Sequence, residues 1–362
     1  MEKYEIIVIG AGPVGLYLGS SLGKLFDVLI LDSKPENFTY KGFRVMNLDS
    51  FSKYGIPQSL IKLEIRRVYL YSPSMKYKIT TSERLRGYVV EKSELEKFLL
   101  KKAKLNSEVK FNSPVVSTNV DKKEVKTKNG EEYRFNFLIG ADGPTSRTRS
   151  LVTSEKVMSI KCYSEIYENT EKKRDPSVFF LYETPSFYGW CIPAGDLIEY
   201  GIGDQKSPVE TFESLKRKTK PSSKIVSKSG GLIPISFVSR VAKHSIFLVG
   251  DATGGEPFLG SSLNKGADEA NLLVQSLKQY SKTNEKPEKM YQRLWDKKIK
   301  PDLEKQRTFR KIFFSSREML EKSFKELKGK EIEGEGLVNG PLKNLTKILI
   351  RLYSNISTDG FS

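Results

Sequence analysis

The sequence is poor in the residues that most often carry chemistry. Its 362 residues include two cysteines, Cys162 and Cys191, and one histidine, His244. So few cysteines exclude a disulfide scaffold and a cysteine-rich metal or iron–sulfur site, and we expect no metal. Unpaired thiols are favoured over a disulfide in a reducing compartment, although the sequence leaves the pairing open. The histidine stands just before an apolar run and is predicted to lie in a surface turn, so any reaction must depend mostly on a cofactor.

Long apolar runs are also missing. No run approaches the roughly 18 residues needed to cross a bilayer, and the first residues enter a predicted strand without room for a signal peptide. We therefore expect a cytoplasmic protein, with a peripheral place at the inner membrane face as an alternative. The composition of 38% hydrophobic and 29% charged residues predicts a globular fold, and the length suggests two domains or one interleaved pair.

The charge is strongly one-sided, with a formal net charge of +17. Such a charge favours an anionic membrane surface, a nucleic acid or an acidic protein as partner. The lysines are spread along the chain and no nucleic-acid module is present, so we expect no nucleic acid. A lysine-rich solvated surface, as in a heat-adapted protein, is the simpler alternative.

Residues 4–32 carry the pattern of a βαβ unit. Short apolar runs at 6–9 and 28–31 predict two buried strands, and helical spacing of apolar and small residues lies between them. The first strand leads directly into G-x-G-x-x-G, and the second ends on Asp32. This combination predicts dinucleotide binding, whereas a lone glycine turn would not.

Each glycine of this turn has an expected role. Gly10 allows the tight turn, Gly12 lets a pyrophosphate approach the backbone, and Gly15 lets the helix pack on the strand. The phosphate charge would then meet the free N–H groups at the start of the helix, with Pro13 and Val14 in its first turn. Asp32 is placed to accept hydrogen bonds from ribose hydroxyls.

Two further motifs follow apolar strands: Gly-Ala-Asp-Gly at 140–143 and Gly-Asp-Ala at 250–252. Between them the texture changes to antiparallel strands. We therefore predict an α/β fold with an added antiparallel sheet, in which a Rossmann-like domain (1–65, 85–158 and 236–282) is interrupted by a mainly-β substrate domain (66–84 and 159–235). Residues 283–362 form a helical C-terminal region, with a basic helix over 290–314, a linker over 331–339 and an amphipathic helix over 342–353.

The three motifs together resemble the FAD-dependent oxidoreductases of the glutathione-reductase-like, hydroxylase-type class. The resemblance implies that the first motif holds the ADP pyrophosphate, that the GADG stretch lines the cofactor cleft and that Asp251 binds the ribityl chain. It also places the helix that begins at Leu263 near the flavin N1–C2=O edge. The implied FAD-binding residues are Gly10, Gly12, Pro13, Val14, Gly15, Asp32, Arg44, Val116, Asp142, Gly143, Gly250, Asp251, Pro257, Gly260, Ser261, Ser262 and Leu263.

The stretch P-x-x-Y-x-W-x-x-P at 185–193 narrows the family. It resembles the PxxYxWxFP motif of the geranylgeranyl reductases, with Ile192 in place of phenylalanine. Segments at 88–95 and 230–234 resemble that family's GYVV and GGxIP stretches. The resemblance implies that Tyr188, Trp190 and Pro193 line the substrate site. The alternative is that Tyr188 and Trp190, which face the same side of a strand, only fill the core.

The resemblance implies FAD-dependent reduction of isolated C=C bonds in a geranylgeranyl or other polyprenyl chain, as in the synthesis of archaeal-type membrane lipids. NADPH or a ferredoxin would donate the electrons. The proton donor is open, with Tyr188 as a weak candidate. A flavin-dependent monooxygenase or halogenase on the same fold is the alternative, because residues 188–193 also resemble the halogenase WxWxIP stretch. The third hypothesis is non-enzymatic: a flavoprotein scaffold or a membrane-bound lipid carrier. The prenyl substrate, its headgroup, the number of double bonds reduced and the oligomeric state cannot be read from the sequence.

Overall fold

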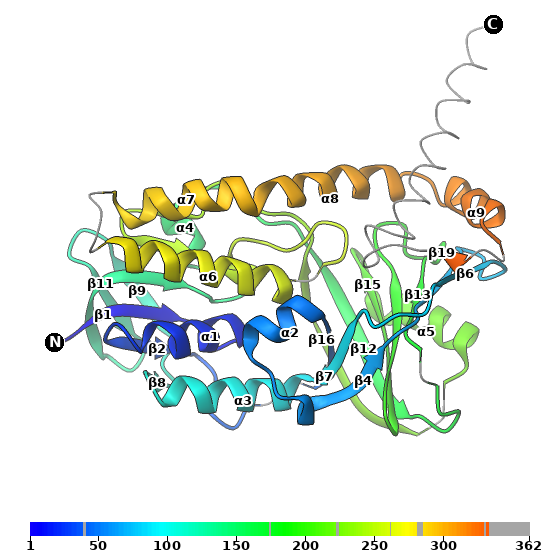
Figure 1. Cartoon of the computed structure of the whole chain (residues 1–362), viewed down its shortest axis with the longest axis horizontal. Coiled ribbons are helices and arrows are strands. Elements are labelled where there is room, and N and C mark those ends of the chain that lie inside the picture. The colour runs from blue at the N-terminus through cyan, green and yellow to red at the C-terminus, as the bar shows by residue number, and fades with distance from the viewer. Residues whose placement is uncertain are drawn as a thin grey trace, which may run out of the picture.

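The computed structural model describes residues 1–38, 41–173, 175–221, 224–260, 262–280, 285–328 and 331–332. In these residues an elongated molecule is built on three sheets (Figure 1). The first sheet lies at the end that carries the N-terminus, the second at the opposite end, and α7 and α8 run along one side from one to the other. The predicted combination of a Rossmann-like unit, an antiparallel sheet and a helical C-terminal region is confirmed.

The first sheet has the order β17-β18-β11-β1-β2-β8; β10 also pairs with β11, and β9 pairs with β10. The pairs β1–β2, β1–β11 and β11–β18 are parallel, so the carboxyl ends of these strands meet at one edge. All four residues of β2 are buried, as the apolar run predicts. The strands are β1 (Glu2–Ile9), β2 (Val28–Leu31), β8 (Glu108–Lys110), β9 (Val115–Asn119), β10 (Glu124–Thr127), β11 (Glu132–Gly140), β17 (Ala242–Lys243) and β18 (Ile246–Leu248).

Helices cover this sheet: α1 (Pro13–Leu22), α3 (Lys92–Lys104), α4 (Arg149–Val152) and α6 (Leu263–Tyr280), with α7 (Pro287–Lys298) outside α6. α3 begins at Lys92, with Glu91 as its N-cap residue. Ser93 Oγ donates a hydrogen bond to the Glu91 carboxylate at 2.7 Å instead of capping the helix. His244 has a left-handed backbone (φ 49°) and is exposed, so its predicted place in a surface turn is confirmed.

The second sheet has the order β16-β12-β15-β14-β13-β5-β6-β19 and is mainly antiparallel. α5 (Pro208–Thr219) packs on one face through Phe212 and Leu215. The sequence indicates the 225–234 segment only through a family motif, but the segment forms a full edge strand. The strands are β5 (Tyr69–Tyr71), β6 (Lys78–Thr81), β12 (Ser159–Glu168), β13 (Ser177–Phe179), β14 (Gly189–Ala194), β15 (Leu197–Asp204), β16 (Ile225–Pro234) and β19 (Glu331–Ile332).

A small sheet of order β3-β7-β4 lies between the other two. Its strands are β3 (Phe43–Asn47), β4 (Ile61–Ile65) and β7 (Gly87–Glu91). The helix α2 (Leu48–Tyr54) follows β3, and the 3-10 turn η1 (Gln58–Leu60) precedes β4. Asn47 caps α2 by accepting a hydrogen bond from Ser50 N at 2.7 Å. This sheet matters for the site because β3 carries Arg44, whose charge acts on Lys92 at the start of α3 and on Cys162 of the second sheet.

The C-terminal region differs in part from the prediction. The helix expected over 290–314 is two helices, α7 and α8 (Lys300–Phe313), because Pro301 lacks the N–H that would continue the first helix. α9 (Arg317–Glu326) follows. Residues 331–332 of the predicted linker form β19, which pairs with β6, and the linker's remainder and the helix predicted over 342–353 lie outside the described residues. No helix of the described ranges is long and apolar enough to cross a membrane.

Candidate cofactor and substrate site

The three glycines of the turn after β1 differ in their surroundings. Two are closely packed against the backbone, and one has open space beside it. Gly10 has φ +107°, and a Cβ there would lie 2.3 Å from the Ala141 carbonyl oxygen. A Cβ on Gly15 would lie 2.0 Å from the Gly10 oxygen. By contrast, a Cβ on Gly12 would meet no atom within 4 Å. Gly12 also precedes α1 without a side-chain cap, and Pro13 opens the helix. The space and the uncapped N–H groups fit a pyrophosphate.

Asp32 holds this turn in shape. One of its carboxylate oxygens accepts a hydrogen bond from Ala11 N at 2.6 Å and the other accepts one from Lys34 N at 2.8 Å. Ser113 N donates a hydrogen bond to the Asp32 carbonyl oxygen at 2.8 Å. Val116 follows Ser113 by three residues and is exposed on β9. Carboxylate oxygens have further lone pairs for a ribose. The cofactor contacts of Asp32 and Val116 stay predictions.

Asp142 is occupied by its own loop. Its carboxylate accepts hydrogen bonds from Ser146 Oγ at 2.5 Å, Arg147 N at 2.8 Å and Thr148 N at 3.0 Å. The side chain therefore orders the turn that leads to α4. Gly143 has φ +82°, and a Cβ there would meet no atom within 4 Å, so open space lies beside that turn. A cofactor contact in this stretch would thus involve Gly143 more readily than the Asp142 carboxylate.

Arg149, which sequence patterns did not indicate, joins the second and third motifs. Its guanidinium donates to the carbonyl oxygens of Ala252 at 2.7 Å, Asp251 at 3.0 Å and Pro144 at 3.1 Å. The 3-10 turn η2 (Gly250–Ala252), which carries Asp251, is thereby fixed to the loop after β11. Because β1, β11 and β18 are parallel neighbours, all three motifs meet at one sheet edge.

A buried ion pair holds η2 from the other side. Glu269 accepts hydrogen bonds from Gly250 N at 2.7 Å, Thr253 Oγ1 at 2.8 Å and Trp295 Nε1 at 2.9 Å. Lys265 donates to Glu269 at 2.8 Å and to Gly250 O at 3.1 Å, and both side chains are almost fully buried. Most of these contacts serve the loop that bears Asp251, so the pair sets the position of that loop.

Arg44 and Lys34 lie close enough to Lys92 for their charges to act on it. Arg44 is exposed on β3, and Lys92 lies at the start of α3. Burial, followed by the charge of Arg44, lowers the pKa of Lys92 to about 7. The charges of Glu96 and Asp251 raise the pKa of Lys92 in part, and the charge of Lys34 lowers it further. Lys92 was not among the predicted site residues, although it directly follows the strand of the GYVV-like stretch.

We predict that FAD binding weakens as pH rises through about 7. A pyrophosphate favours the ammonium form of Lys92, whose pKa in the free protein is about 7. The pKa in the complex is therefore higher, and binding takes up a proton. Affinity is greatest below pH 7 and falls above it. Isothermal titration with FAD from about pH 6 to pH 9 checks this across the range in which a lowered lysine titrates.

Lys92→Arg is the matched control, because its guanidinium stays charged across this range. It should bind FAD with a flat pH profile. Lys92→Met should lose about 10- to 100-fold in affinity, the worth of a hydrogen bond to a charged group. An unchanged pH profile in Lys92→Met would rule out Lys92 as its source.

The loop after η2 lies under the second sheet. A Cβ on Gly260, whose φ is +67°, would lie 2.3 Å from Ile233 Cγ2. Ser262 Oγ is 3.5 Å from Gly254 O, and Tyr54 OH donates to Leu263 O at 2.9 Å. Pro257 O accepts a hydrogen bond from Arg310 at 3.1 Å. Ser261, predicted as a cofactor contact, lies outside the described residues.

Tyr188 and Trp190 lie on one face of the second sheet, as their spacing predicts. Tyr188 OH donates to Leu259 O at 2.6 Å, so this face is turned toward the loop after η2. Trp190 Nε1 donates to Glu199 at 3.1 Å, and a Cβ on Gly201 would lie 2.2 Å from the indole ring. Pro193, an odd number of residues further along the strand, is buried on the opposite face. The structure therefore brings two of the three predicted substrate residues together.

Two protonated groups occupy the same junction. Burial raises the pKa of Tyr188 well above its usual value. Burial likewise raises the pKa of Glu256 to about 8, and its Oε2 has no hydrogen-bond partner among the described residues. Glu256 was not predicted as a site residue. Both groups are able to retain a proton at neutral pH.

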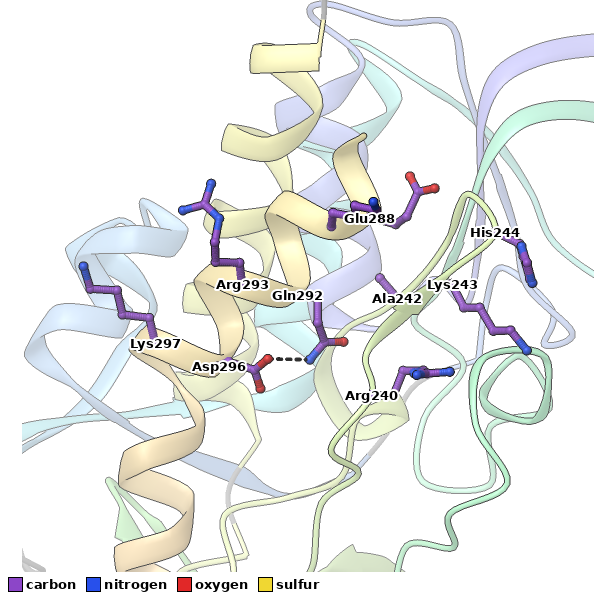
Figure 2. A pocket seen from close by; sticks show the side chains of 10 residues that line it. Arg240, Ala242, Lys243, His244, Glu288, Gln292, Arg293, Asp296 and Lys297 are labelled. Carbon is purple, nitrogen blue, oxygen red and sulfur yellow. Dashed lines mark hydrogen bonds between the residues drawn. The ribbon is translucent and has the colours of Figure 1, made fainter. Parts of the chain in front are cut away.

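A separate pocket of about 770 Å³ lies beside β17 and α7 (Figure 2). In Figure 2 Glu288, Gln292 and Asp296 lie on the side of α7 toward the segment that carries Arg240 and Lys243, whereas Arg293 and Lys297 point away from it. Gln292 donates a hydrogen bond to Asp296 at 3.1 Å. This segment precedes β18, so it lies at the amino edge of the sheet, away from the three motifs. The pocket is therefore no part of the cofactor site.

The family model for the FAD binding domain matches residues 3–202, more than half of the chain. The chain belongs to this family, and FAD is its cofactor. It is 24% identical over 375 residues to the digeranylgeranylglycerophospholipid reductase of Methanocaldococcus jannaschii, covering 96% of each chain. Cys162 and Cys191, whose pairing the sequence leaves open, are both free thiols in the structure.

Solved structures share the fold. A geranylgeranyl bacteriochlorophyll reductase-like protein from Thermoplasma acidophilum has a TM-score of 0.83 at 19% identity, covering 99% of this chain and 98% of that one. The p-nitrophenol 4-monooxygenase of Pseudomonas putida has a TM-score of 0.68 at 16% identity, covering 98% of each. The predicted membership in the geranylgeranyl reductase family of FAD-dependent oxidoreductases is confirmed.

Proposed function

We propose that the protein reduces isolated C=C bonds in a geranylgeranyl or related polyprenyl chain of a lipid, with FAD as the redox cofactor. The hydrogen bond from Tyr188 OH to Leu259 O carries this proposal, because it places an aromatic sheet face directly over the loop after η2. Such a face suits an apolar chain, which has few polar groups to recognise. The reductase names of the sequence relative and of the structural neighbour support the same substrate class.

The chemistry that FAD supplies when bound is hydride transfer to one alkene carbon. The chain must then orient the alkene, exclude water and supply a proton to the other carbon. Tyr188 is the proton-donor candidate predicted from the sequence, and Glu256 is a second protonated group in the same junction. The charge of +17 suits an anionic lipid surface as well as an acidic ferredoxin, and NADPH is the alternative electron donor.

The test is anaerobic. The FAD-loaded protein is reduced with dithionite and incubated with a digeranylgeranyl glycerophospholipid, and the lipid is analysed by mass spectrometry. We expect a gain of two hydrogen atoms for each double bond reduced, and no gain with dithionite and free FAD alone. Unchanged mass across several prenyl substrates would reject the proposal. Incorporation of an oxygen atom in air would support the monooxygenase alternative.

A further inference from the structure

Two arginines turn inward where α8 meets α9. Arg310 lies in the last turn of α8 and is half-buried, and Arg317 is the first residue of α9 and only 6% exposed. Both guanidinium groups lie near the ring of Phe314, each 5.0 Å from its centroid. The two cations thus share one apolar corner between the helical C-terminal region and the second sheet.

Their hydrogen bonds converge on two loops. Arg310 donates to Pro257 O at 3.1 Å, in the loop after η2, and to Ser186 O, in the stretch that leads to Tyr188. Arg317 donates to Phe187 O at 2.6 Å and to Thr184 O in that same stretch. Arg310 therefore bridges the loop beside the predicted flavin contacts and the segment that forms the substrate wall.

The bridge has a second member. Tyr188 OH reaches Leu259 O, two residues after Pro257. The ring of Tyr188 stacks on that of Phe187 at 4.1 Å between centroids. Two contacts therefore join the loop after η2 to the stretch that leads to Tyr188. One is made by Arg310 and the other by Tyr188 itself.

Electrostatics argue against a general stabilising role for the arginines. Among the described residues, neither makes an ion pair with a carboxylate, and Nε and Nη1 of Arg317 have no hydrogen-bond partner. Burial lowers the pKa of Arg310 to about 10, and burial with the charge of Arg310 lowers the pKa of Arg317 to about 9. An uncompensated buried cation is costly and is a poor way to gain stability. What the pair does achieve is a fixed geometry for four carbonyl oxygens in two loops.

We infer that Arg310 is a positioning residue that fixes the aromatic wall at Tyr188 against the loop after η2 (residues 254–260). It thereby aligns a bound prenyl chain with the flavin. The alignment of substrate rests on the proposed function, whereas the loop contact does not. Misplacement of a reacting group by about 1 Å is enough to cost on the order of 100-fold in rate. The arginine acts through the two loops and needs no contact with substrate.

The test compares Arg310→Met and Arg310→Lys with wild type and with Lys305→Met, a change at an exposed cation on the same helix. We expect Arg310→Met to bind one FAD per chain and to show altered flavin absorption and fluorescence without substrate. Its kcat on a prenyl lipid should fall by about 10- to 100-fold with little change in KM. Arg310→Lys should recover part of kcat, and Lys305→Met should match wild type in every readout.

A double-mutant cycle with Tyr188→Phe separates the contact from the activity. Coupled residues give non-additive effects, so the flavin spectrum of the double variant should differ little from that of Arg310→Met. A wild-type flavin spectrum in Arg310→Met, loss of FAD from it, or fully additive effects would overturn the inference. If wild-type protein reduces no prenyl lipid, the proposed function fails, while the flavin spectra still decide whether Arg310 positions the loop.

Discussion

Replacement of Gly12 by valine is expected to leave the protein folded and to remove most of its FAD affinity. Gly12 has φ −73° and ψ 176°, which any residue adopts, and a Cβ there meets no protein atom within 4 Å. The added methyl groups would instead occupy the space in front of the uncapped start of α1. Overpacking costs about 1–3 kcal/mol, which corresponds to about 5- to 150-fold in Kd. Fluorescence titration with FAD and thermal unfolding of the apoprotein measure the two effects separately.

Gly15→Ala is the matched comparison within the same turn. Its Cβ would lie 2.0 Å from the Gly10 oxygen, so the strand and helix must move apart. We expect this variant to lose apoprotein stability, which Gly12→Val keeps. Gly12→Val that binds FAD like wild type would show that the pyrophosphate lies elsewhere.

The cofactor motifs could be predicted because each is a local pattern at a strand end. A run such as that of β2, followed by an acidic residue, needs no tertiary information. Arg149 could not be found in this way, since its acceptors Asp251 and Ala252 lie 102 and 103 residues further along the sequence. For Lys265 and Glu269 a signal did exist. They are spaced i, i+4 among the apolar residues of α6, where charged side chains in a buried stripe indicate a pair.

The elements that the sequence did not predict owe their form to contacts. β16 lacks regular alternation because Gly230 and Gly231 stand in its middle, and it is a strand because it pairs with β12 over most of its length. The family motif groups Pro193 with Tyr188 and Trp190, although strand alternation alone places it on the other face. The sequence indicates Arg310 only as part of a basic helix. Ser316, which caps α9, marks the break between α8 and α9 in the sequence, but it does not indicate where the side chain of Arg310 points.

Glu269→Ala is expected to cost about 3–5 kcal/mol of unfolding free energy, because Lys265 is left as a buried charge without its carboxylate. Gly250 N, Thr253 Oγ1 and Trp295 Nε1 lose an acceptor at the same time. Urea unfolding of the apoprotein measures the loss. Since these contacts mostly serve the loop that carries Asp251, we also expect FAD to bind more weakly to the fraction that is still folded.

The double variant Lys265→Met/Glu269→Leu decides which part of that loss is charge burial. Both replacements are apolar and of similar length, so no unpaired charge is left, and such swaps of buried pairs are often near neutral. Stability should therefore recover in large part. FAD affinity should not recover, because Gly250 N still lacks its carboxylate acceptor and η2 is no longer held. If affinity returned together with stability, the ion pair would serve folding alone, and the position of Asp251 would depend on Arg149.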